Sequence, residues 1–439
     1  MARKYLIETW GCQANVHDGE RMAGLLEQAG FEPTDQAEQA DVVVLNTCSV
    51  REHAQEKLFS RLGELRTLED RPLIAVAGCV AQQEGAQILK RAPYVDVVVG
   101  TQATRRLPML LQQAETAGQR QVDINPYEDV SFPLGLTRRA DRVRAYVTIL
   151  EGCNDYCAFC VVPYTRGHER MRLKAEILAE VQEAVATGRK EIHLLGQIVN
   201  HYQAPDDAAC DFPGLLEAVD SVPGVQRIRF ASPHPRHASQ KLVEAIRDLP
   251  HVCKHMHLPV QSGSTRVLRA MRRRHTREDY LDLVDRLRSA VPGIALSTDM
   301  IVGFPGETVE DFEQTLSLTR RVGFHSMFSF KYSERPNTLA AKRLEDDVPE
   351  GEKGRRLSEL QALQREIQLE LNRRAVGARL AVLVDSRSRR DERELAGRTT
   401  GNTVVNLPGE PGWLGRLLTV EILRAGPNSL WGEAVQALE

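Results

Sequence analysis

Strand-like and helix-like segments alternate along most of this 439-residue chain. In the first part the β-rich runs, most of them followed by helical patterns such as residues 17–29, cover residues 5–9, 41–45, 73–77 and 94–99. In the middle part they cover residues 144–150, 191–195, 227–231, 255–258, 295–302 and 327–332. Such alternation is typical of parallel sheets whose strands are joined by helices. We therefore expect an α/β protein.

The chain is too long for one ordinary domain, and three are expected. Residues 1–120 predict a doubly wound parallel sheet, and residues 139–372 predict a partial β/α barrel. Residues 120–140 lack clear periodicity and contain Asn125-Pro126, which indicates a linker. Residues 373–439 predict a small antiparallel β-barrel, because short strand-like runs separated by turn residues cover residues 379–384, 404–407, 417–423 and 431–435.

Three cysteines with C-x3-C-x2-C spacing, Cys153, Cys157 and Cys160, follow the first strand expected in the barrel. Three thiolates leave one iron of a cubane cluster without a protein ligand, and that iron is open to a small molecule. A structural zinc site normally has four ligands and C-x2-C pairs. The spacing therefore favours a reactive iron-sulfur cluster.

Three other cysteines, Cys12, Cys48 and Cys79, each lie just past the end of one of the first three strands. The carboxyl ends of parallel strands share one edge of the sheet, so these cysteines are expected to converge. The alternative is a small buried residue at each tight turn. Three equivalent positions favour a second cluster, and the helix N-termini that follow favour thiolates. Cys210 and Cys253 belong to no such pattern and are interpreted as ordinary buried thiols.

The formal net charge of −3 argues against a protein that coats nucleic acid generally, so any RNA binding must be local. Two basic clusters are candidates for phosphate contact, one within residues 266–277 and one containing Arg387, Arg389, Arg390 and Arg398. Aromatic residues make up only 5% of the chain, which argues against a broad base-stacking platform. No run long enough to span a bilayer and no signal-peptide core are present, so we expect no membrane partner and a cytoplasmic location.

Several motifs together resemble the methylthiotransferase family of the radical S-adenosylmethionine superfamily, and within it the branch that acts on tRNA. The resemblance covers essentially the whole chain. It rests on Gly11-Cys12-Gln13-Ala14-Asn15, Asn46-Thr47-Cys48-Ser49, Gly78-Cys79-Val80-Ala81-Gln82, Tyr164-Thr165-Arg166-Gly167-His168-Glu169-Arg170, Gly196-Gln197-Ile198-Val199-Asn200, Leu258-Pro259-Val260-Gln261-Ser262-Gly263, Asp299-Met300-Ile301-Val302-Gly303-Phe304-Pro305-Gly306-Glu307 and Gly397-Arg398-Thr399-Thr400-Gly401-Asn402. One departure is Ser232-Pro233-His234-Pro235, where the family usually has Ser-His-Pro, and this is expected to alter a loop at the barrel edge.

The resemblance implies a radical enzyme with two [4Fe-4S] clusters and no catalytic acid or base. Cys12, Cys48 and Cys79 would hold an auxiliary cluster, and Cys153, Cys157 and Cys160 the cluster that cleaves S-adenosylmethionine. The implied reaction uses two S-adenosylmethionine molecules to place a methylthio group on carbon 2 of an isopentenylated (N6-dimethylallyl) adenosine at position 37 of tRNA, beside the anticodon. A TRAM domain would grip the RNA, and a flavodoxin-like or ferredoxin-like protein would donate electrons.

Cofactor contacts beyond the cysteines are predicted from the loop after one barrel strand. Gly303, Gly306 and Glu307 lie there, and glycines permit close backbone approach to S-adenosylmethionine. A simple turn is the alternative. Gln197 and Gln261 are weaker polar candidates.

Two rival functions are left open. One is a methylthiotransferase for threonylcarbamoylated adenosine in tRNA or for an aspartate of a ribosomal protein, since the cluster motifs are shared among these enzymes. The other is a non-catalytic RNA-binding protein stabilised by a structural metal, which predicts zinc or no metal and no cleavage of S-adenosylmethionine.

Overall fold

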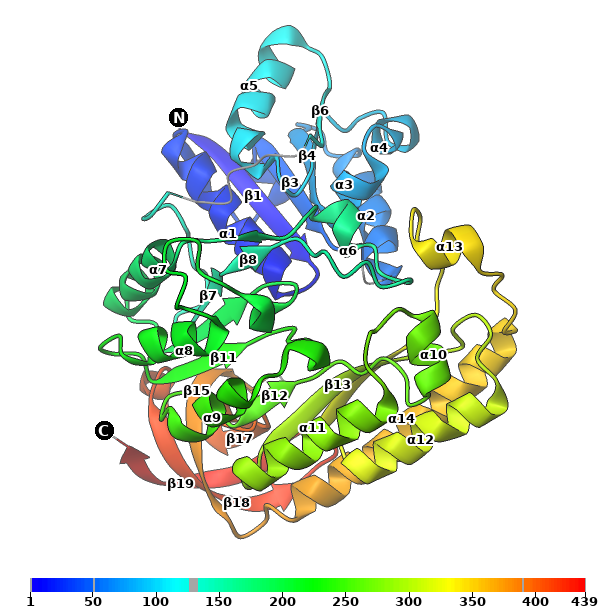
Figure 1. Cartoon of the computed structure of the whole chain (residues 1–439). Helices are drawn as coiled ribbons and strands as arrows, with labels where there is room; N and C mark the ends of the chain where they lie inside the picture. Colours follow the sequence, from blue (N-terminus) through cyan, green and yellow to red (C-terminus); the bar gives the residue numbers. More distant parts are fainter. Residues whose placement is uncertain (1, 50–51, 126–132, 389–390, 439) are drawn as a thin grey trace.

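The computed structural model describes residues 2–49, 52–125, 133–388 and 391–438, and it begins with a six-stranded parallel sheet (Figure 1). The strand order is β2-β1-β3-β4-β5-β6. The strands are β1 (Arg3–Trp10), β2 (Phe31–Pro33), β3 (Val42–Thr47), β4 (Leu73–Gly78), β5 (Val97–Val99) and β6 (Gln121–Asp123). The helices are α1 (Gln13–Gln28), α2 (Glu52–Leu65), α3 (Cys79–Glu84), α4 (Gln87–Arg91) and α5 (Leu107–Ala117).

Helices cover both faces of this sheet, which confirms the doubly wound fold. One apolar cluster joins the strands to α1 and α5, through Met22 and Leu110 among others. A second cluster joins the opposite face to α2, through Leu58 and Leu62. The strand order reverses between β1 and β3, and in such sheets the crevice for ligands lies at the carboxyl ends of those two strands. The short strands β2 and β6 were not predicted.

The middle part is an open β/α barrel of two three-stranded parallel sheets, β11-β10-β7 and β12-β13-β14. A parallel bridge links Ile228 of β11 to Val252, in the segment that leads into β12. The strands are β7 (Arg144–Thr148), β10 (Glu191–Leu195), β11 (Arg227–Phe230), β12 (His255–His257), β13 (Ala295–Val302) and β14 (Ser326–Lys331). The outer helices are α7 (Lys174–Ala186), α8 (Phe212–Asp220), α9 (Gln240–Asp248), α10 (Thr265–Ala270), α11 (Arg277–Ala290), α12 (Val309–Val322) and α14 (Glu350–Arg373). This is the partial barrel predicted from the sequence.

Alternation along the strands separates the inner face of the barrel from its outer face. On β13, Leu296, Met300 and Val302 belong to the main apolar core, which the outer helices share. Because successive side chains of a strand point to opposite faces, Asp299 and Ile301 face the interior of the barrel. Four short elements lie at the carboxyl ends of the strands: β8 (Leu150–Glu151), β9 (Arg170–Met171), α6 (Val162–Thr165) and α13 (Leu339–Arg343).

The last part is a closed five-stranded barrel with the order β15-β16-β17-β19-β18. Its strands are β15 (Arg379–Arg387), β16 (Glu394–Thr399), β17 (Val404–Pro408), β18 (Leu417–Ala425) and β19 (Leu430–Leu438). Strand β16 was not predicted. The barrel is antiparallel as expected except where β17 and β19 pair in parallel. It packs beneath the middle part (Figure 1), where Arg227 and Arg229 of β11 donate to backbone carbonyls of β15 and β16.

Among the described helices, none combines the length and the apolar character that crossing a bilayer requires.

Candidate active site between two cysteine trios

Cys12, Cys48 and Cys79 meet at the carboxyl edge of the N-terminal sheet. Cys12 precedes α1, Cys48 follows β3 and Cys79 begins α3. The Cys48 thiol lies within hydrogen-bonding reach of the thiols of Cys12 and Cys79. Gly78 permits this close approach, because its φ is +89° and a Cβ there would lie 2.5 Å from the Asn46 side-chain oxygen. We call these three residues the N-terminal trio.

The surroundings of the N-terminal trio favour negative charge. The hydrogen bond with Cys48 and the nearby Arg166 guanidinium lower the pKa of Cys12 to about 5 and that of Cys79 to about 7. The pKa of Cys48 is raised, since its thiol faces both neighbours. Arg166 is buried and forms an ion pair of 2.7 Å with Asp18 of α1. Thiolates are the form in which cysteine binds iron, so the donor set and its charge suit an iron-sulfur cluster.

Cys153, Cys157 and Cys160 form the barrel trio, in the loop between β8 and α6. The Cys153 amide donates to the Gly167 carbonyl at 3.1 Å, and the Cys160 amide donates to the Cys157 carbonyl at 3.0 Å. Arg273 approaches the Cys157 sulfur at 3.7 Å. Burial raises the pKa of Cys153 to about 11 and that of Cys160 to about 12. These two thiols therefore need a cationic partner, such as iron, to ionise at neutral pH.

No group of three or more histidine, cysteine and carboxylate side chains in the described ranges is arranged to hold a single metal ion. A cubane cluster spreads its cysteine ligands over several iron atoms, which is a wider arrangement than the shell of one ion. The lack of a single-ion shell in the described ranges is thus compatible with a cluster at each trio.

Asp155, which the sequence did not single out, lies within the barrel trio's loop and is surrounded by basic side chains. Arg236 and Arg274 approach its carboxylate at 3.6 Å and 3.7 Å. His234 lies 3.7 Å away, and burial together with Arg273 holds the pKa of His234 well below its ordinary value, so this imidazole is neutral. The loop that departs from the family pattern, residues 232–235, therefore contacts the cysteine loop directly.

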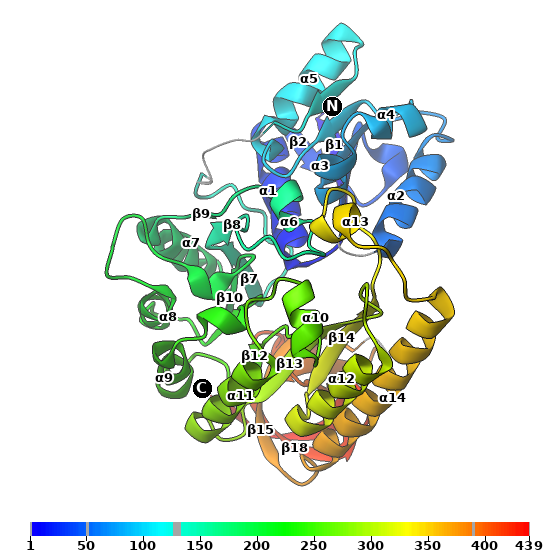
Figure 2. The ribbon, with the colours of Figure 1, turned by 45° about the vertical axis from the view of Figure 1, so that its right-hand side comes forward.

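Residues 165–167 connect the barrel trio to the N-terminal sheet. Thr101 donates to the Thr165 carbonyl, and Gln102 donates to the Arg166 carbonyl at 2.8 Å. Helix α6 lies against α3 in both ribbon views (Figures 1 and 2). One short segment thus carries Arg166 toward the N-terminal trio and, through Gly167, supports Cys153.

The residues proposed to contact S-adenosylmethionine have partners within the protein. Glu307 accepts from the Gly303 amide at 2.8 Å and forms a buried 2.7 Å ion pair with Arg356. The Gly306 amide donates to Asp347 at 2.6 Å. The Gln197 side-chain oxygen accepts from the Gly152 amide at 2.6 Å, beside the barrel trio. Gln261 is buried with a φ of +79°. Their contact with the cofactor stays a prediction.

The basic residues predicted to bind RNA differ in their surroundings. Arg387 is exposed at the end of β15. Arg398 lies 3.4 Å from Asp385 and donates to Asn402, so an acidic partner compensates its charge. Arg389 and Arg390 lie outside the described residues. In the other cluster, Arg266 pairs with Asp311, Arg273 with the Pro259 carbonyl and Arg277 with the Gly263 carbonyl.

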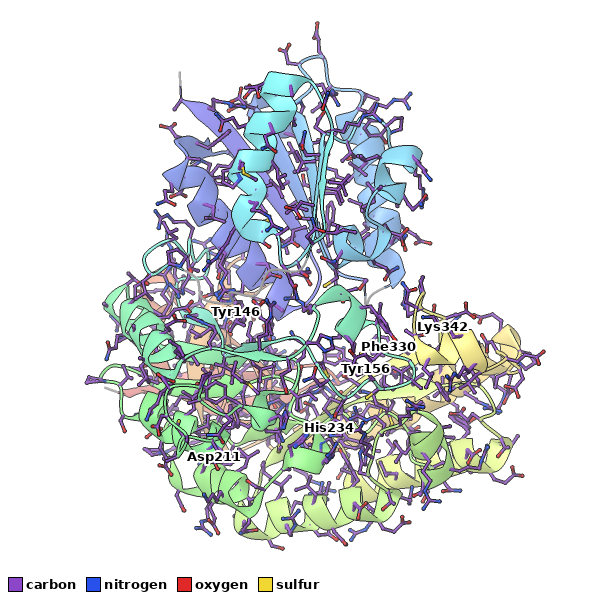
Figure 3. All side chains as sticks on the ribbon, turned by 45° about the horizontal axis from the view of Figure 1, so that its top comes forward. Tyr146, Tyr156, Asp211, His234, Phe330 and Lys342 are labelled. Carbon is purple, nitrogen blue, oxygen red and sulfur yellow. The ribbon has the colours of Figure 1, made fainter. Side chains whose placement is uncertain are left out.

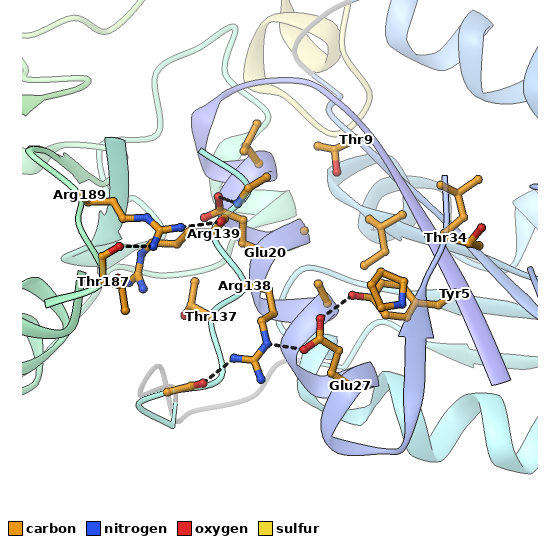
Figure 4. A pocket seen from close by; sticks show the side chains of 18 of the residues that line it. Tyr5, Thr9, Glu20, Glu27, Thr34, Thr137, Arg138, Arg139, Thr187 and Arg189 are labelled. Carbon is orange, nitrogen blue, oxygen red and sulfur yellow. Dashed lines mark hydrogen bonds and ion pairs between the residues drawn. The ribbon is translucent and has the colours of Figure 1, made fainter. Parts of the chain in front are cut away.

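A cavity of about 740 Å³ lies elsewhere, between β1, α1 and the segment that leads into the barrel (Figure 4). Its polar side chains largely satisfy one another: Tyr5 donates to Glu27 at 3.1 Å, Arg138 pairs with the same carboxylate, and Arg189 donates to the Arg139 carbonyl at 2.8 Å. Among the described residues, none of those predicted for cofactor or RNA contact lines it.

Comparison with known proteins assigns each part of the chain to a described family. Residues 4–100 match the model of Uncharacterized protein family UPF0004, residues 147–319 that of the radical SAM superfamily and residues 373–435 that of the TRAM domain. A radical S-adenosylmethionine methyltransferase from Kitasatospora setae, TsrM, shares the fold with a TM-score of 0.57 at 15% identity, over 89% of this chain and 78% of that one.

Much closer relatives share the whole length. The tRNA-2-methylthio-N(6)-dimethylallyladenosine synthase of Halorhodospira halophila is 48% identical, with 99% of this chain and 93% of the relative covered. The enzyme of the same name from Chromobacterium violaceum is also 48% identical, with 99% of each chain covered. This chain belongs to the tRNA-2-methylthio-N(6)-dimethylallyladenosine synthase family, within the radical S-adenosylmethionine superfamily.

Proposed function

We propose that this enzyme transfers a methylthio group to carbon 2 of N6-dimethylallyladenosine at position 37 of tRNA. The observation that carries the proposal is the full-length similarity to synthases of this name, together with the two cysteine trios joined by residues 165–167. Each part of the chain has its own role in this reaction. Residues 1–120 hold the sulfur chemistry, residues 139–372 the radical chemistry and residues 373–439 the RNA.

The cofactors are two [4Fe-4S] clusters and S-adenosylmethionine. We assign the auxiliary cluster to Cys12, Cys48 and Cys79, and the other cluster to Cys153, Cys157 and Cys160. Carbon 2 of adenine carries a C–H bond that no side-chain base deprotonates usefully. A cluster with an open iron, when it has S-adenosylmethionine bound, supplies the radical chemistry that such a bond requires.

Side chains of the protein fix the position of the two donor sets and place positive charge beside them. Arg166, fixed by Asp18, keeps positive charge beside the N-terminal trio, and Arg273 does the same beside Cys157. Gln197 fixes the start of the cysteine loop through the Gly152 amide. Because the segment after the barrel trio is bonded to Thr101 and Gln102, the two trios keep a constant relative position.

The partners follow from this chemistry. A tRNA with isopentenylated adenosine is the substrate, and Arg387 is the described residue of the second basic cluster that is exposed for phosphate contact. A flavodoxin-like or ferredoxin-like protein supplies the electrons. We propose a cytoplasmic location, because tRNA is modified there.

The rival substrates are less well supported. The relatives described above are named for dimethylallyladenosine in tRNA, and neither name mentions threonylcarbamoyladenosine or a ribosomal protein. The non-catalytic alternative predicts zinc or no metal and no cleavage of S-adenosylmethionine.

One assay tests the function. The protein is reconstituted anaerobically with iron and sulfide and incubated with reductant, S-adenosylmethionine and isopentenylated tRNA, and nucleosides are identified by mass spectrometry. Methylthio-dimethylallyladenosine together with deoxyadenosine is the expected result. Deoxyadenosine without that nucleoside would retain the radical enzyme and reject the substrate, and absence of both in protein with two confirmed clusters would reject the enzyme.

Single cysteine variants test the division of labour. Cys48→Ala is expected to abolish methylthio transfer and to leave deoxyadenosine formation detectable, whereas Cys157→Ala abolishes both. Cys210→Ala is the matched control, because Cys210 is a buried cysteine outside both trios. Equal loss of deoxyadenosine in Cys48→Ala and Cys157→Ala would contradict the assignment of the two clusters.

A further inference from the structure

Large aromatic side chains are scarce on the surface of this protein. Among the described residues, the exposed aromatic side chains are those of Tyr156, Tyr164, Phe328 and Phe330. Two belong to the barrel trio's loop and α6, and two belong to β14. We call this set the aromatic rim. A contiguous apolar patch on a protein surface often marks a binding site, whereas single exposed apolar residues do not.

The two tyrosines form one half of the rim. Tyr156 and Tyr164 pack edge to face with ring centroids 6.3 Å apart. Tyr156 adopts a φ of +47°, a strained conformation for a bulky residue that is often kept at functional sites. The Lys342 ammonium of α13 lies 5.7 Å from the centre of the Tyr164 ring. An aromatic surface with a cation at its side is how proteins bind a nucleobase and its phosphate.

The two phenylalanines form the other half. Phe328 and Phe330 pair in register with Asp299 and Ile301 of β13, so they face the interior of the barrel. Phe328 is 58% exposed and Phe330 is 43% exposed, although this face of the barrel encloses the reaction space. Strand β14 ends its sheet, so these rings stand at the open side of the barrel.

A small apolar cluster holds the two halves together. Ala158 of the cysteine loop, Tyr332 after β14 and Ala340 of α13 are buried in the same cluster. The Ala340 amide also donates to the Ala158 carbonyl at 2.8 Å. Figure 3 shows Tyr156, Phe330 and Lys342 in the region where the N-terminal sheet faces the barrel.

We propose that the aromatic rim binds the target nucleoside, with adenine stacked on the tyrosines and the dimethylallyl group packed on the phenylalanines. The inference rests on the proposed function. Its occupant follows from chemistry, because the rim offers a stacking surface, an apolar surface and a cation, which match a base, a branched hydrocarbon and a phosphate. An adenosine must also leave its stack before carbon 2 can react, and aromatic side chains replace the lost stacking.

The test compares the affinity of the reconstituted enzyme for two anticodon stem-loop RNAs that differ only in the dimethylallyl group. We expect Phe328→Thr/Phe330→Thr to bind the modified RNA about tenfold more weakly, because apolar contact with the group is lost. Its affinity for the unmodified RNA should stay at the wild-type value. Tyr164→Ala should weaken binding of both RNAs about tenfold, as expected for a lost stacking partner, while Tyr164→Phe keeps wild-type affinity.

Met109→Ala is the control, because Met109 is an exposed apolar residue on α5. Iron content and circular dichroism establish that each variant is folded and loaded. If the wild-type enzyme binds both RNAs equally, the proposed substrate is wrong. If the wild-type enzyme discriminates and the double variant keeps the same ratio of affinities, the aromatic rim does not bind the dimethylallyl group and this inference alone fails.

Discussion

Buried ionisable side chains connect α1 to the barrel residue by residue. His17 lies 2.8 Å from Thr148 and 3.3 Å from Glu180. Arg21 lies 3.3 Å from Glu151. Buried polar groups are tolerated only where they are paired, so α1 can turn a charged face to the barrel while Met22 and Leu26 pack on the N-terminal sheet. The N-terminal sheet is therefore held against the barrel by specific contacts.

His17 makes the stability of this contact depend on pH. Burial lowers its pKa to about 4, below the ordinary value of 6.5. Above pH 6.5 the residue is neutral in both states, whereas between pH 6.5 and 4 the unfolded chain binds the proton first. The free energy of unfolding should therefore fall by about 3 kcal/mol as the pH falls through this range.

Urea unfolding of the wild type and of His17→Gln at pH 7 and pH 4 measures this contribution. His17→Gln is less stable at pH 7 because it loses the contacts with Thr148 and Glu180, and the difference from wild type should shrink toward pH 4. A difference that stays constant with pH would mean that His17 does not titrate on unfolding.

At the scale of elements, the loop after β13 is shaped by its contact with α14. Glu307 bridges the Gly303 amide and Arg356 of α14, and Lys353 of the same helix packs against Gly303. The motif that predicts a cofactor contact, residues 303–307, therefore also holds the loop after β13 against α14. Its glycine is required by φ, which is +70° at Gly303.

Two glycine substitutions distinguish the effect of backbone strain on stability from the effect of chain entropy. Gly303→Ala should lower the free energy of unfolding by about 1–3 kcal/mol, because its Cβ would lie 2.4 Å from Lys353 Cγ at a positive φ. Gly354→Ala, near the start of α14 and with no described atom outside the helix backbone within 4 Å of its added Cβ, should raise that free energy by up to about 1 kcal/mol. Denaturant unfolding measures both, and destabilisation of equal size would refute the conformational explanation.

At the scale of the whole molecule, the C-terminal barrel is anchored by arginines of β11. Arg229 bonds Glu191 at 2.9 Å and donates to the Thr399 carbonyl at 2.7 Å, and all of these groups are buried. Gly401 also lies close to Ala295. The turn after β16 is thus packed against the base of the middle barrel, which fixes the position of the C-terminal barrel relative to the middle barrel.

Removal of this anchor should loosen the C-terminal barrel. Arg229→Met removes the cation beside the buried Glu191 carboxylate and leaves His193 as its neighbour at 2.6 Å. We expect the free energy of unfolding to fall by about 3 kcal/mol, because a buried charge loses its partner. Hydrogen exchange followed by mass spectrometry should show faster exchange in residues 394–408. The control is Arg424→Met, because Arg424 stacks on Trp431 within the C-terminal barrel. Unchanged exchange in Arg229→Met would place the anchor elsewhere.

Local pattern alone was enough for the fold class and for the placement of the cysteines. Strand and helix periodicity depends on near neighbours, and a cysteine after each strand implies a shared edge in any parallel sheet. The strands β2 and β6 were missed because runs of three residues carry little periodicity, and β16 was missed because Gly397 and two charged residues interrupt its strand pattern. The ion-pair partner of Glu307 is Arg356, which lies far away in sequence. The ion-pair partner of Arg398 is Asp385, which lies on the neighbouring strand.

Only the tertiary structure decided how the parts meet. It brought Arg166 of the middle barrel toward the N-terminal trio, placed residues 232–235 against Asp155 and gathered the aromatic rim from separate segments. These contacts join residues far apart in the chain, so they depend on how whole elements pack and leave no periodic signal in the sequence. The sequence by itself determined the two sets of cysteines and the elements that carry them, and packing determined their surroundings.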